Sequence, residues 1–220
     1  LKDRAGHIVE DLEAVKMPQD GRELVLSIDR RVQYLAFREL SNAIEDNHAQ
    51  AGSAVVLDAK TGEVLAMVNL PSYNPNNRSR LAGAQLRNRV LTDTFEPGST
   101  MKPFTAAIAL ELGRIKPDTV IQTSPGKLTI GTATISDSHP HGALTVEGVL
   151  QKSSNIGTAK LQLQMPAEKV GAFYRELGFG SVPDTGFPGE AKGLLRPSAK
   201  WRPIEQATMA YGHGMSVSLL

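Results

Sequence analysis

The stretch that decides the fold is Phe95-Glu96-Pro97-Gly98-Ser99-Thr100-Met101-Lys102-Pro103-Phe104, which runs into a segment rich in Ala, Ile and Leu and stops at Gly113. Proline is tolerated in or near the first turn of a helix, so Pro103 predicts a helix that begins at or just before Ser99. The residues after Pro103 are apolar on nearly every side, which predicts that this helix is buried inside a domain. Ser99 and Lys102 then lie one turn apart on one face, where the lysine could take the proton of the serine hydroxyl.

A serine three residues before a lysine is a weak signal by itself, because about one such match is expected by chance in a chain of this composition. The same sequence contains a second match, Ser124-Pro125-Gly126-Lys127. Its central Pro-Gly forbids the helical turn that would bring the serine and lysine together. The helical context makes Ser99 informative, although a purely structural serine at a helix start remains open on this evidence.

A second candidate feature is Ser153-Ser154-Asn155, which interrupts two predicted helices at residues 145–152 and 156–164, the first of them capped by Thr145. The first and third residues of such a turn can point the same way while the middle one points elsewhere. The Ser153 hydroxyl and the Asn155 amide would then lie side by side. A plain helix break with capping side chains is the alternative interpretation.

The rest of the chain predicts a mixed α/β fold. Residues 24–28 are predicted to form a strand, and Asp29 to cap an amphipathic helix that ends near residue 47. Two continuously apolar runs, 53–58 and 63–69, predict a β-hairpin covered on both faces. Residues 70–81 are predicted to be loop, 120–135 to form two short strands, 167–177 to form a helix, and 178–196 to be loop.

Composition excludes several functions. The 24 Lys and Arg residues balance 23 Asp and Glu residues, so no basic surface for nucleic acid is expected. The absence of cysteine excludes disulfides, thiolate metal sites and a cysteine nucleophile. No stretch approaches the roughly 20 apolar residues of a membrane helix, and the first residues form no signal peptide, so we expect a soluble chain or the soluble part of an anchored one.

The histidines do not predict a metal site or a Ser-His-Asp hydrolase. His139 and His141 flank a proline in a predicted loop without a third ligand at a regular spacing. Pro97-Gly98-Ser99-Thr100-Met101 lacks the second glycine of a nucleophile elbow. The lysine after Ser99 favours a Ser-Lys solution instead.

Taken together, these residues resemble the transpeptidase domain of a class B penicillin-binding protein, closest to the division-specific penicillin-binding protein 3 type. The stretch around Ser99 resembles the first motif of that family, and Lys152-Ser153-Ser154-Asn155 resembles the second. Supporting similarity runs from about residue 24 to residue 220. Lys60-Thr61-Gly62 matches the letters of the third motif, but it lies in a predicted hairpin turn upstream of Ser99, where turn chemistry and exposure explain it.

The resemblance implies a penicillin-binding or β-lactamase-like fold, with a central, mainly antiparallel sheet flanked by helices plus a helical subdomain. Residues 1–21 would end a preceding pedestal domain or linker, and residues 22–220 would form the N-terminal part of the transpeptidase domain. The third motif and the last strands would follow residue 220, so this fragment alone is expected to be inactive.

The resemblance also implies the roles of the site residues. Ser99 would be the nucleophile, Lys102 its base, and Ser153 a proton relay, while Asn155 would hold Lys102 and the substrate amide. Gly98 and Ser154 would contact substrate. No cofactor and no metal are expected.

The implied function is crosslinking of peptidoglycan stem peptides through a serine acyl-enzyme during septal wall synthesis, with β-lactams binding covalently at Ser99. The implied location is the periplasmic side of the bacterial inner membrane, behind an N-terminal transmembrane anchor. Division-complex membrane proteins, including a lipid-linked glycosyltransferase, are the expected partners. A non-catalytic β-lactam sensor or division scaffold, a D,D-carboxypeptidase and a serine β-lactamase remain as alternatives.

Overall fold

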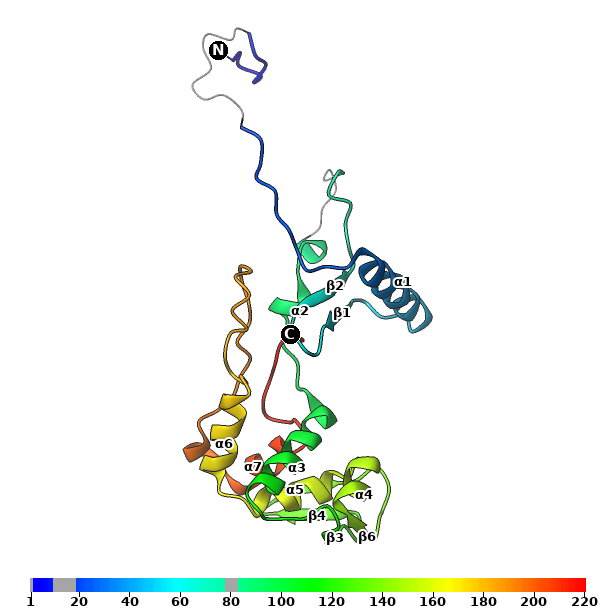
Figure 1. Cartoon of the computed structure of the whole chain (residues 1–220), viewed down its shortest axis with the longest axis vertical. Coiled ribbons are helices and arrows are strands. Elements are labelled where there is room, and N and C mark those ends of the chain that lie inside the picture. The colour runs from blue at the N-terminus through cyan, green and yellow to red at the C-terminus, as the bar shows by residue number, and fades with distance from the viewer. Residues whose placement is uncertain (1, 10–18, 78–82) are drawn as a thin grey trace.

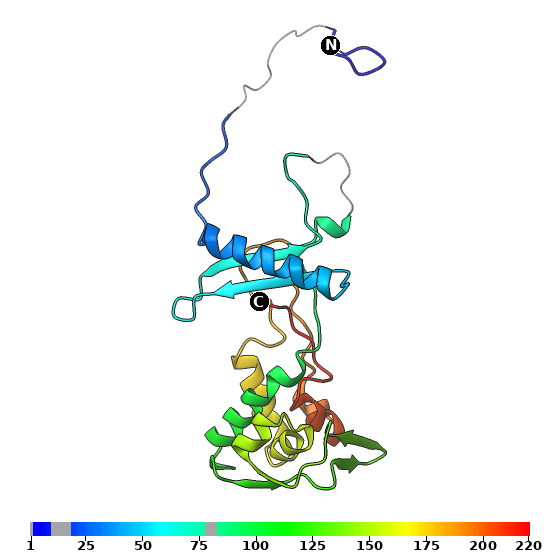
Figure 2. The same ribbon diagram turned by 90° about the vertical axis from the view of Figure 1, so that its right-hand side faces the viewer.

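The computed structural model describes residues 2–9, 19–77 and 83–220, and arranges them in two lobes joined by extended segments (Figures 1 and 2). One lobe holds a β-hairpin and the long helix α1, and the other holds most of the remaining helices and strands. Three extended segments are tied together between the lobes, because Phe95 bridges Val217 and Leu194 bridges Ser216. The last residues of the chain therefore return to the hairpin lobe, where the Leu219 N–H donates to the Val90 carbonyl.

The hairpin lobe agrees with the sequence pattern. Helix α1 spans Arg30–Asp46, and the Asp29 carboxylate caps it by accepting from the N–H groups of Arg31 and Val32. Strands β1 (Gly52–Leu57) and β2 (Val64–Leu70) pair antiparallel, and the short helix α2 covers Arg89–Thr92. The predicted capped helix and hairpin are thus confirmed, and loop structure follows over the described part of residues 71–81.

The start of α1 closes the side of β2 that faces away from β1. The Gln33 side-chain amide donates to the Met67 carbonyl at 2.9 Å and accepts from the Met67 N–H at 2.8 Å. The Asp29 N–H donates to the Leu65 carbonyl at 2.9 Å. A side chain and a helix cap therefore occupy the positions that a neighbouring strand would fill.

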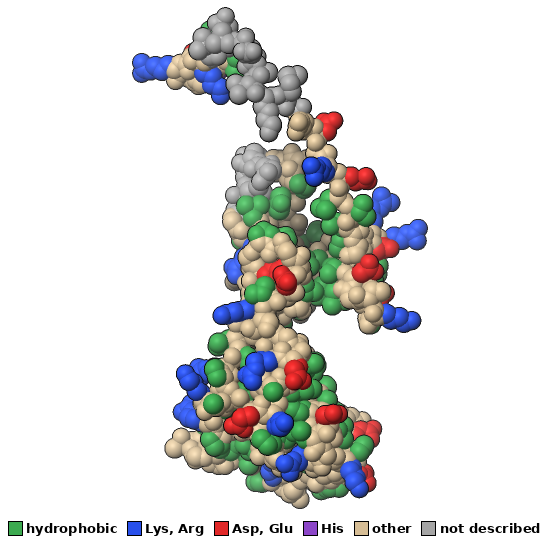
Figure 3. Space-filling model, turned by 60° about the vertical axis from the view of Figure 1, so that its left-hand side comes forward, with side chains coloured by type: hydrophobic (Ala, Val, Ile, Leu, Met, Phe, Trp, Pro, Cys, Tyr) green, Lys and Arg blue, Asp and Glu red, His purple; other side chains and the backbone are tan. Residues whose placement is uncertain are grey.

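Two expectations for this lobe were wrong. Residues 24–28 do not form a strand, and Leu24, Val25 and Leu26 are 79%, 84% and 64% exposed, because the described residues offer this segment no strand to pair with. The hairpin is not fully covered on both faces either, since only Ala66 and Val68 among its strand residues are buried. Figure 3 shows hydrophobic side chains at the surface of this lobe.

The second lobe begins with the predicted buried helix. A 3₁₀ turn at Gly98–Met101 leads into α3 (Lys102–Glu111), and Gly113 ends the helix with a positive φ of 61°. The helices that follow are α4 (Val146–Gln151), α5 (Asn155–Leu163), α6 (Ala167–Glu176) and α7 (Pro203–Met209). A further 3₁₀ turn lies at Ser198–Lys200 before α7, and another, at Gly83–Gln85, lies earlier in the chain between β2 and α2.

Two further antiparallel pairs complete this lobe. Strand β3 (Val120–Gln122) pairs with β6 (Ala143–Thr145), and β4 (Lys127–Ile130) pairs with β5 (Ala133–Ser136). Residues 120–136 therefore hold three strands instead of the two expected. The mixed α/β class with antiparallel sheets is confirmed, although strand β6 and helix α7 were not predicted.

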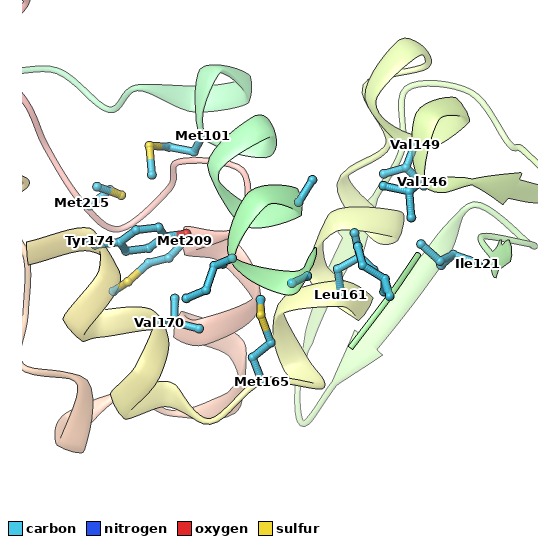
Figure 4. Close-up of a cluster of buried hydrophobic side chains, with 14 residues drawn as sticks. Met101, Ile121, Val146, Val149, Leu161, Met165, Val170, Tyr174, Met209 and Met215 are labelled. Atoms are coloured by element: carbon cyan, nitrogen blue, oxygen red, sulfur yellow. The ribbon is translucent and has the colours of Figure 1, made fainter. Parts of the chain in front are cut away.

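The core of this lobe lies among α3, α4, α5, α6 and α7, and Figure 4 shows its side chains pointing toward one another. Most of this core is apolar, and the burial of apolar surface is the main source of stability for such a lobe. Its most deeply buried members include Met101, Val149, Leu161, Val170, Tyr174, Met209 and Met215.

A polar network crosses the middle of that core. The Tyr174 hydroxyl donates to Gln162 Oε1 at 2.9 Å, and the Thr105 hydroxyl lies 2.9 Å from the Ala210 carbonyl and 3.1 Å from Gln162 Oε1. All three side chains have no exposed surface. Burial without compensating charge raises the pKa of Tyr174 to about 12.

None of the helices that the structure describes is both long and apolar enough to cross a bilayer. Much of residues 1–21 lies outside the described part of the chain, so the assignment of this segment as a linker or domain end stays a prediction.

Candidate active site

Ser99 lies where the extended segment between the lobes turns into α3. It is the second residue of the 3₁₀ turn and is exposed, as is Thr100, whereas Met101 and Lys102 are buried. Pro103 occupies the second position of α3, where its missing N–H costs no helical hydrogen bond. Helical structure therefore begins next to Ser99 as predicted, but as a 3₁₀ turn, and the α-helix itself starts three residues later at Lys102.

Lys102 is buried, with 2% of its surface exposed. Its Nζ donates to the Ser153 carbonyl at 2.5 Å and to the Ser153 hydroxyl at 2.8 Å. Burial lowers the pKa of Lys102 below the ordinary value for lysine, and the nearby Asp137 carboxylate partly offsets this effect. The lysine is thus pushed toward its neutral form, which can accept a proton.

The Ser153 hydroxyl connects this lysine to Ser99. Ser153 Oγ lies 3.2 Å from Ser99 Oγ, so a continuous chain of hydrogen bonds runs from Lys102 through Ser153 to Ser99. The hydrogen bonds of the lysine go to Ser153 and not directly to Ser99. The structure therefore brings together three of the sequence-predicted residues, and Ser153 links Ser99 to Lys102 by hydrogen bonds.

The Ser153 side chain reaches the site because of a sharp turn between α4 and α5. Ser153 has a φ of 53°, in the left-handed region that costs a non-glycine residue about 1–2 kcal/mol. The Ser153 N–H donates to the Leu150 carbonyl and the Ser154 N–H to the Val149 carbonyl, which closes the end of α4. Ser154 then caps α5 by accepting from the Gly157 N–H at 2.9 Å.

The other two residues of this turn are placed differently. The Asn155 Nδ2 donates to the Ser136 carbonyl at 3.1 Å, and the side chain is half-buried at the end of β5. Ser154 is only 1% exposed, and its hydroxyl is engaged on both sides, with Gly157 and with Asp137. The Ser154 side chain thus serves as a helix cap, and a substrate contact by this residue stays a prediction.

Gly98 is held in place by the glycine-rich loop at residues 212–214. The Gly98 N–H donates to the Gly212 carbonyl at 3.4 Å, and the Glu96 carboxylate accepts from the Gly214 N–H at 2.8 Å. Gly212 has a φ of 80°, and a Cβ at this position would lie 2.3 Å from the Gly98 nitrogen and oxygen. Only glycine allows the loop to lie this close to the turn that carries Ser99.

The competing motifs fall where the sequence placed them. Lys60 lies in the tight turn between β1 and β2, and Ser124 lies in a turn before β4, with its hydroxyl on the His141 carbonyl at 3.2 Å. Among the described residues, no three His, Asp or Glu side chains gather as a metal site would require.

Sequence reasoning missed Ser136 and Asp137, at the end of β5. Asp137 accepts from the Ser154 hydroxyl at 2.6 Å and from the Ile156 N–H at 3.0 Å. Both residues lie 17 to 19 positions before their partners, in a stretch that carries no motif, so the sequence offered no signal for either contact.

This geometry, an exposed serine at a helix start joined through a second serine to a buried lysine, agrees with a comparison against known families. Residues 52–220 match the family described as the penicillin binding protein transpeptidase domain. The chain belongs to this family.

Relatives of this transpeptidase domain are similar over the whole chain. The probable peptidoglycan D,D-transpeptidase PenA of Neisseria gonorrhoeae is 49% identical over 222 residues, and the peptidoglycan D,D-transpeptidase FtsI of Escherichia coli strain K12 is 45% identical over 219 residues. Each alignment covers 100% of this chain, but only 38% and 37% of the respective relative. The chain thus spans well under half the length of these relatives.

Solved structures show the same fold. The transpeptidase domain of penicillin-binding protein 3 from Burkholderia pseudomallei matches with a TM-score of 0.80 and 48% identity over 91% of this chain and 56% of that chain. A peptidoglycan glycosyltransferase from Burkholderia ambifaria matches with a TM-score of 0.81 and 49% identity over 88% of this chain and 57% of that chain.

Proposed function

We propose that the protein is a peptidoglycan D,D-transpeptidase that crosslinks stem peptides through an acyl-enzyme at Ser99. The observation that carries this proposal is the hydrogen-bonded chain from the buried Lys102 through Ser153 to Ser99. A serine at the mouth of a helix needs a base to become nucleophilic, and a lysine whose pKa is lowered by burial is favoured as such a base.

The proton path follows from the number of hydrogens on each group. A neutral Lys102 amine keeps hydrogens to donate to the Ser153 carbonyl and has one lone pair free for the Ser153 hydroxyl. With a neutral lysine, the two hydroxyl hydrogen bonds are reversed relative to a charged lysine that donates. Ser99 then donates to Ser153 Oγ, and Ser153 donates to Lys102 Nζ. Attack by Ser99 Oγ moves its proton to Ser153 and the Ser153 proton to Lys102.

In the acylation step, Ser99 Oγ attacks the carbonyl carbon between the two terminal D-alanine residues of a stem peptide. The peptide C–N bond breaks, and the departing amine takes a proton returned through Ser153. The amine of a second stem peptide then attacks the ester, forms the new amide and gives its proton back so that Ser99 is regenerated. Asn155 would orient the substrate amide beside the ester, and Gly98 would flank it.

The developing oxyanion needs donors. The Ser99 N–H lies in the first turn of a helix, where backbone N–H groups are not used by the helix itself, so it can serve as one donor. Loss of one such donor typically slows an enzyme about 10²–10³-fold. A β-lactam would acylate Ser99 by the same attack, and its amine would stay tethered to the acyl group after the ring opens.

The proposal extends to the cellular setting through the relatives. FtsI and PenA are named as a peptidoglycan D,D-transpeptidase and a probable one, which favours a role in cell-wall synthesis. A role at the division site rests on the resemblance of the sequence to the division-specific type. We infer a location on the periplasmic side of the inner membrane behind an N-terminal anchor. The partners would be division-complex membrane proteins, including a lipid-linked glycosyltransferase.

Labelling of the full-length protein with a fluorescent penicillin tests the nucleophile, because the third motif is expected beyond residue 220. The wild-type protein should take up one label per molecule, and Ser99→Ala should take up none. Ser124→Ala is the matched control, because it removes the serine of the second Ser-x-x-Lys match and should label like the wild type. Wild-type protein that stays unlabelled, or label that persists in Ser99→Ala, would overturn the assignment.

A second measurement separates the enzyme classes. Crosslinked product from lipid-linked substrate in the presence of a glycosyltransferase is expected from the wild type and not from Ser99→Ala. Release of D-alanine without crosslinks would identify a carboxypeptidase, rapid turnover of the penicillin label a β-lactamase, and stable label without any peptide product a sensor or scaffold.

A further inference from the structure

We propose that Asp137 is a positioning residue for acyl transfer at Ser99, because its carboxylate fixes the turn at residues 153–155 by hydrogen bonds. This inference rests on the proposed function and adds to it a residue that does not touch the reacting atoms. Asp137 directly follows β5, and its carboxylate contacts the turn at Ser154 and Ile156.

The Asp137 carboxylate binds one residue of the turn, Ser154, and the residue that follows the turn, Ile156. Asp137 Oδ2 accepts from the Ser154 hydroxyl at 2.6 Å, and Oδ1 accepts from the Ile156 N–H at 3.0 Å. The preceding residue, Ser136, accepts from the Asn155 side chain at 3.1 Å. The residues at the end of β5 thus accept hydrogen bonds from three consecutive residues, Ser154, Asn155 and Ile156, and Asp137 is the acceptor in two of these three bonds.

The turn needs such support because of its backbone. Ser153 has a φ of 53°, which a serine keeps only when its surroundings fix it. Its carbonyl and hydroxyl both bond the lysine amine, so a small rotation of the turn moves both acceptors away from Lys102 and the hydroxyl away from Ser99. Misplacement of a catalytic group by about 1 Å can slow a reaction about 10²-fold.

Asp137 also acts on the lysine through its charge. It is the charged group that raises the pKa of Lys102 against the lowering effect of burial, and none of the ion pairs among the described residues involves Lys102. The same side chain therefore sets both the geometry of the relay and the electrostatic environment of its terminal base.

The two roles are separable by substitution. Asp137→Ala removes both hydrogen bonds and the charge. Asp137→Asn removes the charge but keeps an oxygen for the Ile156 N–H, and its amide can donate to Ser154 Oγ. Asp118→Ala is the matched control, because Asp118 is exposed in the loop between α3 and β3.

The test measures acylation of the full-length protein by a fluorescent penicillin under pseudo-first-order conditions, which separates the noncovalent dissociation constant from the acylation rate constant. The rate constant belongs to the molecules that react, so partial unfolding lowers the amplitude of labelling without changing the rate. We expect Asp137→Ala to lower the acylation rate constant about 10²-fold with little change in the dissociation constant. Asp137→Asn should react at least tenfold faster than Asp137→Ala, and Asp118→Ala should match the wild type.

The pH profile gives the second readout. Removal of the Asp137 charge lowers the pKa of Lys102 further, so the rise of acylation with pH should move to lower pH in Asp137→Asn. A wild-type rate constant in Asp137→Ala, or equal loss in Asp137→Asn and Asp137→Ala, would overturn the positioning role while Ser99→Ala still established the nucleophile. Failure of the proposed function itself would show as an unlabelled wild-type protein.

Discussion

The polar network in the core of the second lobe gives a prediction whose size and pH dependence both follow from the structure. Replacing Tyr174 by phenylalanine removes the hydroxyl that donates to Gln162 Oε1 at 2.9 Å. Thr105 has one hydroxyl hydrogen, which can go either to Gln162 or to the Ala210 carbonyl. In Tyr174→Phe one of these buried acceptors must therefore lose its donor.

An unpaired buried acceptor costs about 1–3 kcal/mol. At neutral pH the free energy of unfolding of Tyr174→Phe should fall by this amount, which corresponds to roughly 2–4 °C in Tm for each kcal/mol in a chain of this length. Tyr73→Phe is the matched control, because Tyr73 is 39% exposed and its substitution should change stability by less than about 0.5 kcal/mol.

Alkaline pH should reduce the difference. Tyr174 has a pKa of about 12 in the folded protein, against 10.0 for an ordinary tyrosine, so above pH 10 the unfolded chain loses this proton before the folded chain does. The wild type then loses about 1.4 kcal/mol of stability per pH unit between these values, whereas Tyr174→Phe has no such group. At pH 11 the gap between the two proteins should be smaller by about 1.4 kcal/mol.

Urea unfolding followed by the fluorescence of Trp201, the single tryptophan of the chain and a neighbour of this core, measures both quantities. Equal stability of Tyr174→Phe and Tyr73→Phe at pH 7 would show that the network contributes nothing. A gap of the same size at pH 7 and pH 11 would refute the raised pKa.

Two further predictions concern the site. Gly212→Ala should slow acylation of Ser99 about 10²-fold or more, because its Cβ would lie 2.3 Å from the Gly98 backbone and must displace the turn that carries the serine. Gly142→Ala is the control: a Cβ at Gly142 would have no atom within 4 Å, so the labelling rate should stay unchanged. The acylation rate should rise with pH, and the midpoint of this rise should lie below the ordinary pKa of lysine, because burial favours neutral Lys102. Lys102→Arg, whose side chain stays charged, should acylate about 10²–10⁴-fold more slowly at every pH. A retained rate in Lys102→Arg would exclude Lys102 as the base.

The sequence predicted the elements that are specified locally. Pro103 fixed the start of the Ser99 helix, Asp29 and Thr145 were recognisable caps, and the two apolar runs around Gly62 predicted the hairpin. Each of these signals acts within a few residues. The relation between Ser99 and the turn at Ser153 could be inferred only by resemblance, because 54 residues separate the two hydroxyls.

What the sequence did not predict depends on long-range contacts. Residues 24–28 have the side chains of a strand, but strand propensity does not supply a partner, and the structure leaves them unpaired as a strand. Helix α7 has only seven residues, too few for a clear period, and it is held by packing against α5. Asp137 was missed because its two partners follow it by 17 and 19 residues without any motif.

The contact between Gln33 and Met67 affects how copies of this protein behave toward one another. An exposed strand edge is a template on which another chain can add a strand, and such addition leads to aggregation. The Gln33 amide saturates the Met67 peptide group, and the Asp29 N–H occupies the Leu65 carbonyl, so this edge of the hairpin has little left to offer an incoming strand. The Gln33 side chain and the Asp29 N–H therefore protect this part of β2 from pairing with a second copy.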